Sequence, residues 1–170
     1  MIQAKWKKAD VKAAIQSVAL SVGRAFGIAT PETFVPDYLP AREWEYRFDT
    51  VEVWTIAGPA ELNVTIDNQF AHMYFRFDDP GRALELLGPG RLNHHSGKWN
   101  RLASASASLS GFANVLAQDF ARVADTRPDP AEVDSWKARK AAEAAQWAKW
   151  REEFAQHRQA AQGAAHANVS

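Results

Sequence analysis

The feature that most constrains this chain is an alternation of apolar and polar residues between positions 42 and 78. Trp, Tyr, Phe, Val, Ile and Thr are abundant there, and a period of two is typical of strands that bury one face. Three short pairs, Asp49-Thr50, Gly58-Pro59 and Asn68-Gln69, interrupt the alternation. The segment therefore predicts four antiparallel strands joined by two-residue hairpin loops.

Pairing outward from these loops sorts the side chains into two faces. The loops set three directly opposed pairs: Phe48 with Val51, Ala57 with Ala60, and Asp67 with Phe70. One face is then apolar throughout and holds Trp44, Tyr46, Phe48, Val51, Val53, Leu62, Val64, Ile66, Ala71, Met73, Phe75 and Phe77. A shift by one residue would mix the two faces, so this coherent face supports the register.

The opposite face combines charges with aromatic side chains. Its expected members are Glu43, Glu45, Arg47, Glu52, Trp54, Ile56, Glu61, Asn63, Thr65, His72, Tyr74 and Arg76. The register sets two pairs of opposite charge across the strands, which stabilises a sheet: Arg47 with Glu52, and Glu61 with Arg76. It also sets one row of four residues: Glu45, Trp54, Asn63 and Tyr74.

This polar face has two interpretations. In the first it is an open binding patch whose acidic rim selects a basic partner, because aromatics among polar groups are typical of protein-binding hot spots. In the second a helix covers it, and its aromatics belong to the core.

Apolar stripes at three-to-four spacing predict helices on both sides of the strands. Such stripes indicate helices over residues 9–26 and 104–124, and a short helix over 81–87 follows Pro80. Residues 130–162 are rich in strong helix formers and predict one long helix, followed by a flexible tail over 163–170. We therefore expect an α+β core domain over residues 1–127, with a four-stranded antiparallel meander packed against helices, and a long C-terminal helix.

Composition excludes several classes of function. The chain has 170 residues, with 20 Lys+Arg and 20 Asp+Glu, so it is neither a strongly basic nucleic-acid binder nor an acidic mimic. It has no Cys, which excludes a thiol nucleophile and a thiolate metal site. It has no apolar run of membrane-spanning length, and residues 1–12 lack the apolar centre of a secretory signal, so we expect a cytoplasmic protein without a membrane partner.

Charge is nevertheless unevenly distributed along the chain. Residues 43–79 carry eight acids and two Arg, a net charge of −6. Residues 1–12 carry four Lys and one Asp, and residues 80–127 carry six basic and three acidic groups, so each has a net charge of +3. This asymmetry concerns the choice of partner and not the fold.

The segment RLNHHSGKWNR (91–101) is the densest polar stretch. A Ser-Gly-Lys turn can offer backbone N–H groups and an ammonium to an anion. As a contact loop it would use Asn93, His94, His95, Ser96, Lys98, Trp99 and Asn100. As a structured connector, Trp99 would instead fill the core. Two adjacent His without acidic neighbours do not form a typical metal site, and no G-x-S-x-G elbow surrounds Ser96, so we expect no metal, cofactor or catalytic residue.

Large apolar side chains recur along the predicted C-terminal helix at alternating three and four spacing, as in a heptad seam. They form a first docking point at Val133 and Trp136 and a stronger one at Trp147, Trp150 and Phe154. Lys140 and Glu143 interrupt the seam between them. The stripe can pack on its own domain, pair with a copy of itself or meet a partner; we favour partial protrusion and a homodimer.

Residues 74–100, YFRFDDPGRALELLGPGRLNHHSGKWN, resemble small proteins of bacteriophages and plasmids in which an N-x-x-S-G-K-W-N loop follows a strand and a short helix. This chain has His94 where that pattern has Pro. The resemblance implies a mobile-element origin. By class only, size and α+β composition are similar to those of anti-CRISPR and antirestriction proteins.

The leading functional hypothesis is a non-enzymatic inhibitor that binds a host protein or nucleoprotein complex of bacterial defence or nucleic-acid processing and occludes it. The first alternative is a nucleic-acid-binding accessory protein that uses basic residues and one aromatic: Lys5, Lys7, Lys8, Arg91, Lys98, Arg101 and Trp99. The second alternative is a small hydrolase built on His72 or His95.

Overall fold

The computed structural model describes residues 5–34, 44–88, 92–93 and 98–167. The chain divides into two compact units, Met1–Pro128 and Asp129–Ser170. Among the helices of the described residues, none combines the length and the apolar character that crossing a bilayer requires.

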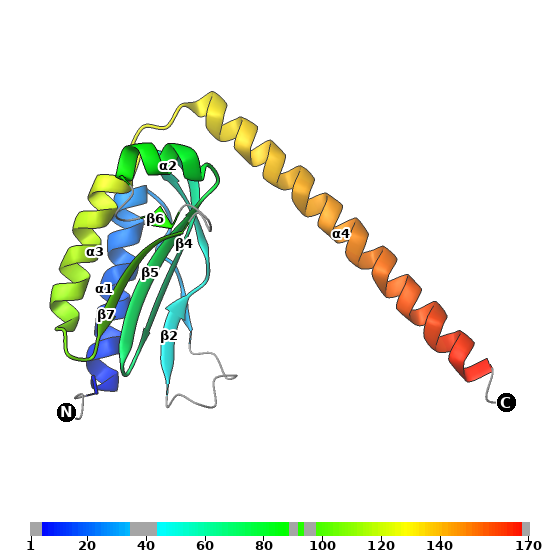
Figure 1. The fold of residues 1–170 in the computed structure, drawn as a ribbon, viewed down its shortest axis with the longest axis horizontal. Helices are drawn as coiled ribbons and strands as arrows, with labels where there is room; N and C mark the ends of the chain where they lie inside the picture. The colour runs from blue at the N-terminus through cyan, green and yellow to red at the C-terminus, as the bar shows by residue number, and fades with distance from the viewer. Residues whose placement is uncertain (1–4, 35–43, 89–91, 94–97, 168–170) are drawn as a thin grey trace. The chain divides into compact units, whose positions relative to one another are not determined.

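The first unit is a two-layer α+β structure with an antiparallel sheet, which confirms the predicted class (Figure 1). Helices α1 (Lys8–Phe26) and α3 (Leu109–Val123) lie side by side on one face of the sheet, and the short helix α2 (Pro80–Leu87) lies at one end of it. The strands are β1 (Thr33–Phe34), β2 (Glu45–Phe48), β3 (Val51–Thr55), β4 (Gly58–Asp67), β5 (Phe70–Phe77), β6 (Leu92–Asn93) and β7 (Lys98–Ser104).

The predicted four-stranded meander is wrong in its strand count and in its connections. The described residues form seven strands in the order β1-β2-β4-β5-β7-β6, and β3 also pairs with β4. Strand β7 occupies residues that the sequence assigned to a loop and to the start of a helix. The Ala- and Ser-rich stretch before α3 resembled a helix, but Ser108 caps α3 by accepting a hydrogen bond from the Gly111 N–H at 2.9 Å.

The register between β4 and β5 is the predicted one, with Ile66 opposite Ala71 around the Asn68-Gln69 turn. The turn between β3 and β4 was predicted at Gly58-Pro59 but lies two residues earlier, at Ile56-Ala57. The pair next to the turn is therefore Thr55 with Gly58, and not Ala57 with Ala60. The buried Thr55 hydroxyl holds this turn by donating to the Gly58 carbonyl at 2.6 Å and accepting from the Ala57 N–H at 3.1 Å. The pairing moves by an even number of residues, so the paired residues of β3 and β4 keep their predicted faces.

The predicted hairpin between β2 and β3 is wrong, because both strands pair with β4 along its length. Arg47 lies opposite Thr65, and Val51 lies opposite Leu62. The chain from Arg47 to Val51 therefore contains one residue more than the stretch of β4 from Leu62 to Thr65 that it pairs with. One extra residue, as in a β-bulge, explains how Phe48 and Val51 both face inward despite their odd spacing. The change in the apolar-polar alternation at Asp49-Thr50 is therefore a bulge between β2 and β3, which both run along β4, and not a chain reversal.

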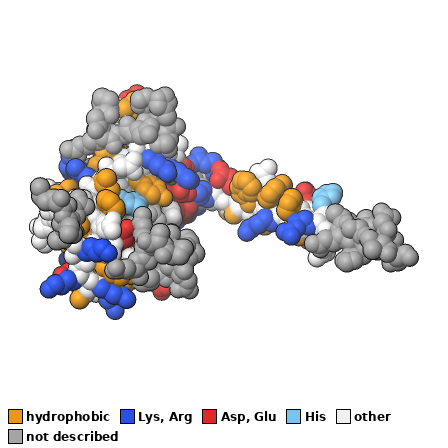
Figure 2. Space-filling view, turned by 60° about the horizontal axis from the view of Figure 1, so that its bottom comes forward, with side chains coloured by type: hydrophobic (Ala, Val, Ile, Leu, Met, Phe, Trp, Pro, Cys, Tyr) orange, Lys and Arg blue, Asp and Glu red, His pale blue; other side chains and the backbone are white. Residues whose placement is uncertain are grey.

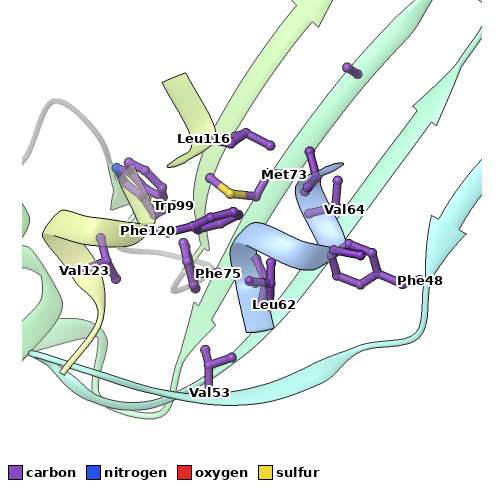
Figure 3. Packing of buried hydrophobic residues seen from close by; sticks show 14 of the residues in the cluster. Phe48, Val53, Leu62, Val64, Met73, Phe75, Trp99, Leu116, Phe120 and Val123 are labelled. Atoms are coloured by element: carbon purple, nitrogen blue, oxygen red, sulfur yellow. The ribbon is translucent and has the colours of Figure 1, made fainter. Parts of the chain in front are cut away.

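Phe75 lies at the centre of the core between the sheet and the two helices (Figure 3). Its ring centroid lies between 5.7 and 6.2 Å from the rings of Phe26, Phe77, Trp99 and Phe120. All twelve residues of the predicted apolar face belong to this core or pack against it, and so do the stripes of α1 and α3. One buried sheet face thus joins every large element of the first unit.

One ion pair crosses the layer between β7 and α3. The Arg101 guanidinium donates to both carboxylate oxygens of Asp119, at 2.6 and 3.1 Å. Asp119 is buried, and one third of the Arg101 side chain is exposed. The pKa of Arg101 is raised above its ordinary value, because the hydrogen bond and charge of Asp119 together outweigh the opposing effect of burial.

The second unit consists of α4 (Pro130–Ala167), a helix of 38 residues and roughly 57 Å. It extends past the predicted end at residue 162. Asp129 caps its first turn, since the carboxylate accepts a hydrogen bond from the Ala131 N–H at 2.9 Å.

Phe75→Ala should lower the free energy of unfolding by about 3–5 kcal/mol, because it leaves a cavity among four aromatic rings. Phe70→Ala on the same strand is the matched control, since Phe70 is 39% exposed and its loss should change stability by less than about 1.5 kcal/mol. Urea denaturation measures both. Equal losses in the two variants would contradict the described core.

Asp119→Ala should lower the free energy of unfolding by about 2–4 kcal/mol, because it leaves a charged guanidinium without its partner at the β7–α3 interface. Because the pKa of Arg101 is raised by folding, its contribution to the free energy of unfolding is fully present below the unfolded-state pKa and is lost only as the pH rises through the folded-state pKa. The stability lost in Asp119→Ala should therefore be the same throughout the neutral pH range. Denaturation of Asp119→Ala and of Glu85→Ala, an exposed carboxylate on α2, tests this at pH 6 and pH 8. A loss that disappears at pH 8 would argue against it.

Candidate partner-binding surface

The sheet face opposite α1 and α3 carries a continuous set of polar and apolar side chains on β5 and β7. Direct pairing puts Arg76 beside Lys98, Tyr74 beside Asn100, and His72 beside Leu102. We call these six residues the open sheet surface. Arg76, Asn100 and Leu102 are exposed, and the other three are half-buried. Leu102 is 72% exposed, the largest value among the exposed large apolar side chains of the described residues.

Tyr74 is the centre of this surface. The His72 ring stacks parallel to it at a centroid distance of 6.4 Å and an angle of 8°. The Lys98 Nζ lies 4.9 Å from the Tyr74 ring centroid, a cation–π distance. Both neighbours restrict the Tyr74 side chain, so little conformational entropy remains to be lost when a partner covers it.

Charge changes sign across the sheet in the row next to Tyr74. Glu52 of β3 lies opposite Glu61 of β4, and Glu61 lies opposite Arg76 of β5, which pairs with Lys98 of β7. The Arg76 guanidinium contacts the Glu61 carboxylate at 3.2 Å. Arg47 and Glu52 are not the direct cross-strand neighbours that the sequence predicted, because Arg47 lies opposite Thr65 and Glu52 opposite Glu61 of β4. This row is therefore acidic at one end and basic at the other, and not acidic throughout.

The structure brings together four of the residues that the sequence assigned to a partner contact: Asn63, Tyr74, Lys98 and Asn100. The predicted row is broken, since Trp54 lies opposite Pro59 and Glu45 opposite Asp67, at the two ends of β4. Glu45 is buried, Trp54 is half-buried, and Ile56 lies in the turn beside the end of α3, where its N–H donates to the Val123 carbonyl at 2.9 Å.

Trp99 is 1% exposed and packs on Phe75, as the connector interpretation of its loop predicted. It therefore offers no surface to a partner. Asn93 lies in β6, opposite Lys98, and its side chain is not described. His94, His95 and Ser96 lie outside the described residues, so their predicted contacts stay predictions.

Sequence reasoning missed Leu102, the most exposed large apolar side chain among the described residues. The signal was the alternation of Lys98, Asn100 and Leu102 with Trp99 and Ala103, which places Leu102 on the polar face of a strand. Arg101 concealed this alternation, because a charged residue on the inward face looks like a break. Its ion pair with Asp119 is what allows it there.

His72 was one of the two histidines on which the sequence based a small hydrolase. Thr65 lies opposite His72 on β4, as predicted, but its hydroxyl donates to the Asn63 Oδ1 at 3.3 Å. In the part of the chain that the structure describes, no three His, Asp or Glu side chains form a group that could hold a metal ion. A groove of about 730 Å³ lies between the start of α1 and the start of α3, and it is open and lined mostly by Ala and Ser.

Comparison of the chain with known protein families, with curated proteins and with solved structures finds no match.

Leu102→Glu should change the free energy of unfolding by less than about 0.5 kcal/mol, because the side chain already lies in water. Thermal and urea denaturation of the full chain measure this. Leu62→Glu is the opposite control, since Leu62 is fully buried and the variant should not fold. A loss above about 2 kcal/mol for Leu102→Glu would show that another part of the chain covers this surface.

Proposed function

We propose that this chain is a non-enzymatic binding protein of a phage or other mobile element, and that it inhibits a bacterial defence or nucleic-acid-processing complex by occluding one of its protein surfaces. The observation that carries the proposal is the open sheet surface, where a restrained Tyr74 and an exposed Leu102 lie among charges of both signs. The mobile-element origin is inferred from the resemblance of residues 74–100.

The composition of this surface favours a protein partner. Tyr and Arg are enriched among residues that dominate binding energy, and an exposed Leu beside them supplies apolar area. Two strands cover only part of a typical interface of about 800 Å² per partner, so these six residues would form its central part. Glu52 and Glu61 at one side and Lys98 at the other would fix the partner's orientation by charge.

Direct nucleic-acid binding is the second candidate, and two observations disfavour it. The acidic Glu52 and Glu61 share a row with the basic residues, which would repel a phosphate backbone. Trp99 is buried and cannot stack on a base, and a base that stacks on Tyr74 would have to compete with Lys98, which already lies over the ring.

Expression of the chain in bacteria that carry restriction or CRISPR defence should raise the plating efficiency of a targeted phage. Leu102→Arg and Tyr74→Ala should abolish the effect, since loss of a hot spot weakens binding by about 30-fold or more. Leu20→Arg on α1 is the matched control, because Leu20 is also exposed but lies outside the sheet surface, and it should act like the unaltered chain.

If the chain leaves the plating efficiency unchanged in strains with restriction defence and in strains with CRISPR defence, the inhibitory function is contradicted. Full activity of both surface variants would contradict the assigned surface. A mobility shift of DNA or RNA that weakens steeply with salt, together with loss of the shift in Lys98→Ala, would favour the second candidate instead.

A further inference from the structure

Three large aromatic side chains are exposed on one side of α4. Trp147, Trp150 and Phe154 are 62%, 52% and 52% exposed, and hydrophobic side chains gather along this helix in Figure 2. Their rings already contact each other, with centroids 5.8 Å apart for Trp147 and Trp150 and 5.5 Å apart for Trp150 and Phe154. A continuous patch of this kind marks an interaction site, because leaving it in water is unfavourable.

The stripe continues toward the start of α4 in heptad spacing, with half-buried Val133 and Trp136 on the same seam. Lys140 and Glu143 occupy the two seam positions between the apolar groups. A seam with one cation and one anion at its centre is selective, since each must face a compatible group across the interface. This pair restricts both the orientation and the register of any copy that pairs with α4.

A parallel pair of copies in register would place Lys140 against the partner's Lys140 and Glu143 against the partner's Glu143. Like charges at adjacent seam layers repel, so this arrangement is disfavoured. An antiparallel pair can place Lys140 against the partner's Glu143, and two-fold symmetry then repeats the same favourable contact. Charge complementarity at the seam therefore selects a second copy in antiparallel orientation.

We propose that α4 pairs with α4 of a second copy as an antiparallel coiled coil, centred between Ala141 and Ala142, with Lys140 facing the partner's Glu143. The same register places Trp136 opposite the partner's Trp147 and Val133 opposite the partner's Trp150, so every apolar seam layer from 133 to 150 meets another apolar layer. A shift by one heptad would place Glu143 against the partner's Trp147 and leave its charge unmatched.

The size of this interface fits a stable dimer. The helices overlap over roughly 36 Å, from Pro130 at the start of α4 to Glu153. Trp136, Trp147 and Trp150 of two copies supply six indoles, and aromatic side chains bury up to about 150–250 Å² each, so the total is on the order of 1,000 Å². This inference uses the second unit alone and does not depend on the proposed function.

Charge exchange on the full-length chain tests the register. In sedimentation equilibrium, Lys140→Glu and Glu143→Lys should each raise the dimer dissociation constant by about 10-fold or more, because each places like charges across the seam. The double variant should restore it to within about three-fold. A mixture of the two single variants should also associate more tightly than either alone. Single variants that dimerise as well as the unaltered chain would overturn the register.

Orientation has an independent readout, because the chain contains no Cys and accepts a single spin label. Labels at Gln159→Cys should lie about 50 Å apart in the antiparallel dimer, since residue 159 is far from the symmetry axis. Labels at Ala142→Cys, next to the axis, should lie within about 20 Å. A short Gln159 distance would show a parallel dimer, and a monomer at high concentration would show that the stripe has another occupant; either result overturns the proposal.

Discussion

Burial of one sheet face beneath α1 and α3 is the interaction on which the first unit depends. Phe75 contacts rings from α1, α3, β5 and β7, so the same side chain holds both helices and two strands. Because successive strand residues point to opposite faces, burying Met73 and Phe75 forces His72, Tyr74 and Arg76 to the other side. The residues that form the open sheet surface are thus determined by the residues that form the core.

Face membership could be predicted from the sequence because it depends only on parity. All twelve predicted core residues of residues 44–77 lie on the helix side, although two of the three proposed turns differ in the structure. The pairing of β4 with β5 was predicted correctly, but that of β2 could not be, because a bulge at Asp49-Thr50 and a reversal produce the same phase change. Strand β7 was hidden by Arg101, whose inward position makes sense only once Asp119 of α3 is known to face it.

The two units present different kinds of surface. The open sheet surface mixes aromatic, apolar and charged groups of both signs, as expected for a contact with another protein. Helix α4 instead repeats large aromatics in a seam with a single charged interruption, as expected for contact with another helix. A chain with both can bind its partner through one unit and pair with its own copy through the other.

The central claim is that β5 buries its odd-numbered side chains beneath the helices and points its even-numbered ones to the opposite face of the sheet. Single Cys substitutions at Ala71, His72, Met73 and Tyr74 in this Cys-free chain, followed by thiol labelling under native conditions, test it most directly. The account predicts rapid labelling at 72 and 74, and labelling slower by on the order of 100-fold at 71 and 73, where local unfolding must come first. Equal rates at all four positions, or slow labelling at 74, would contradict it.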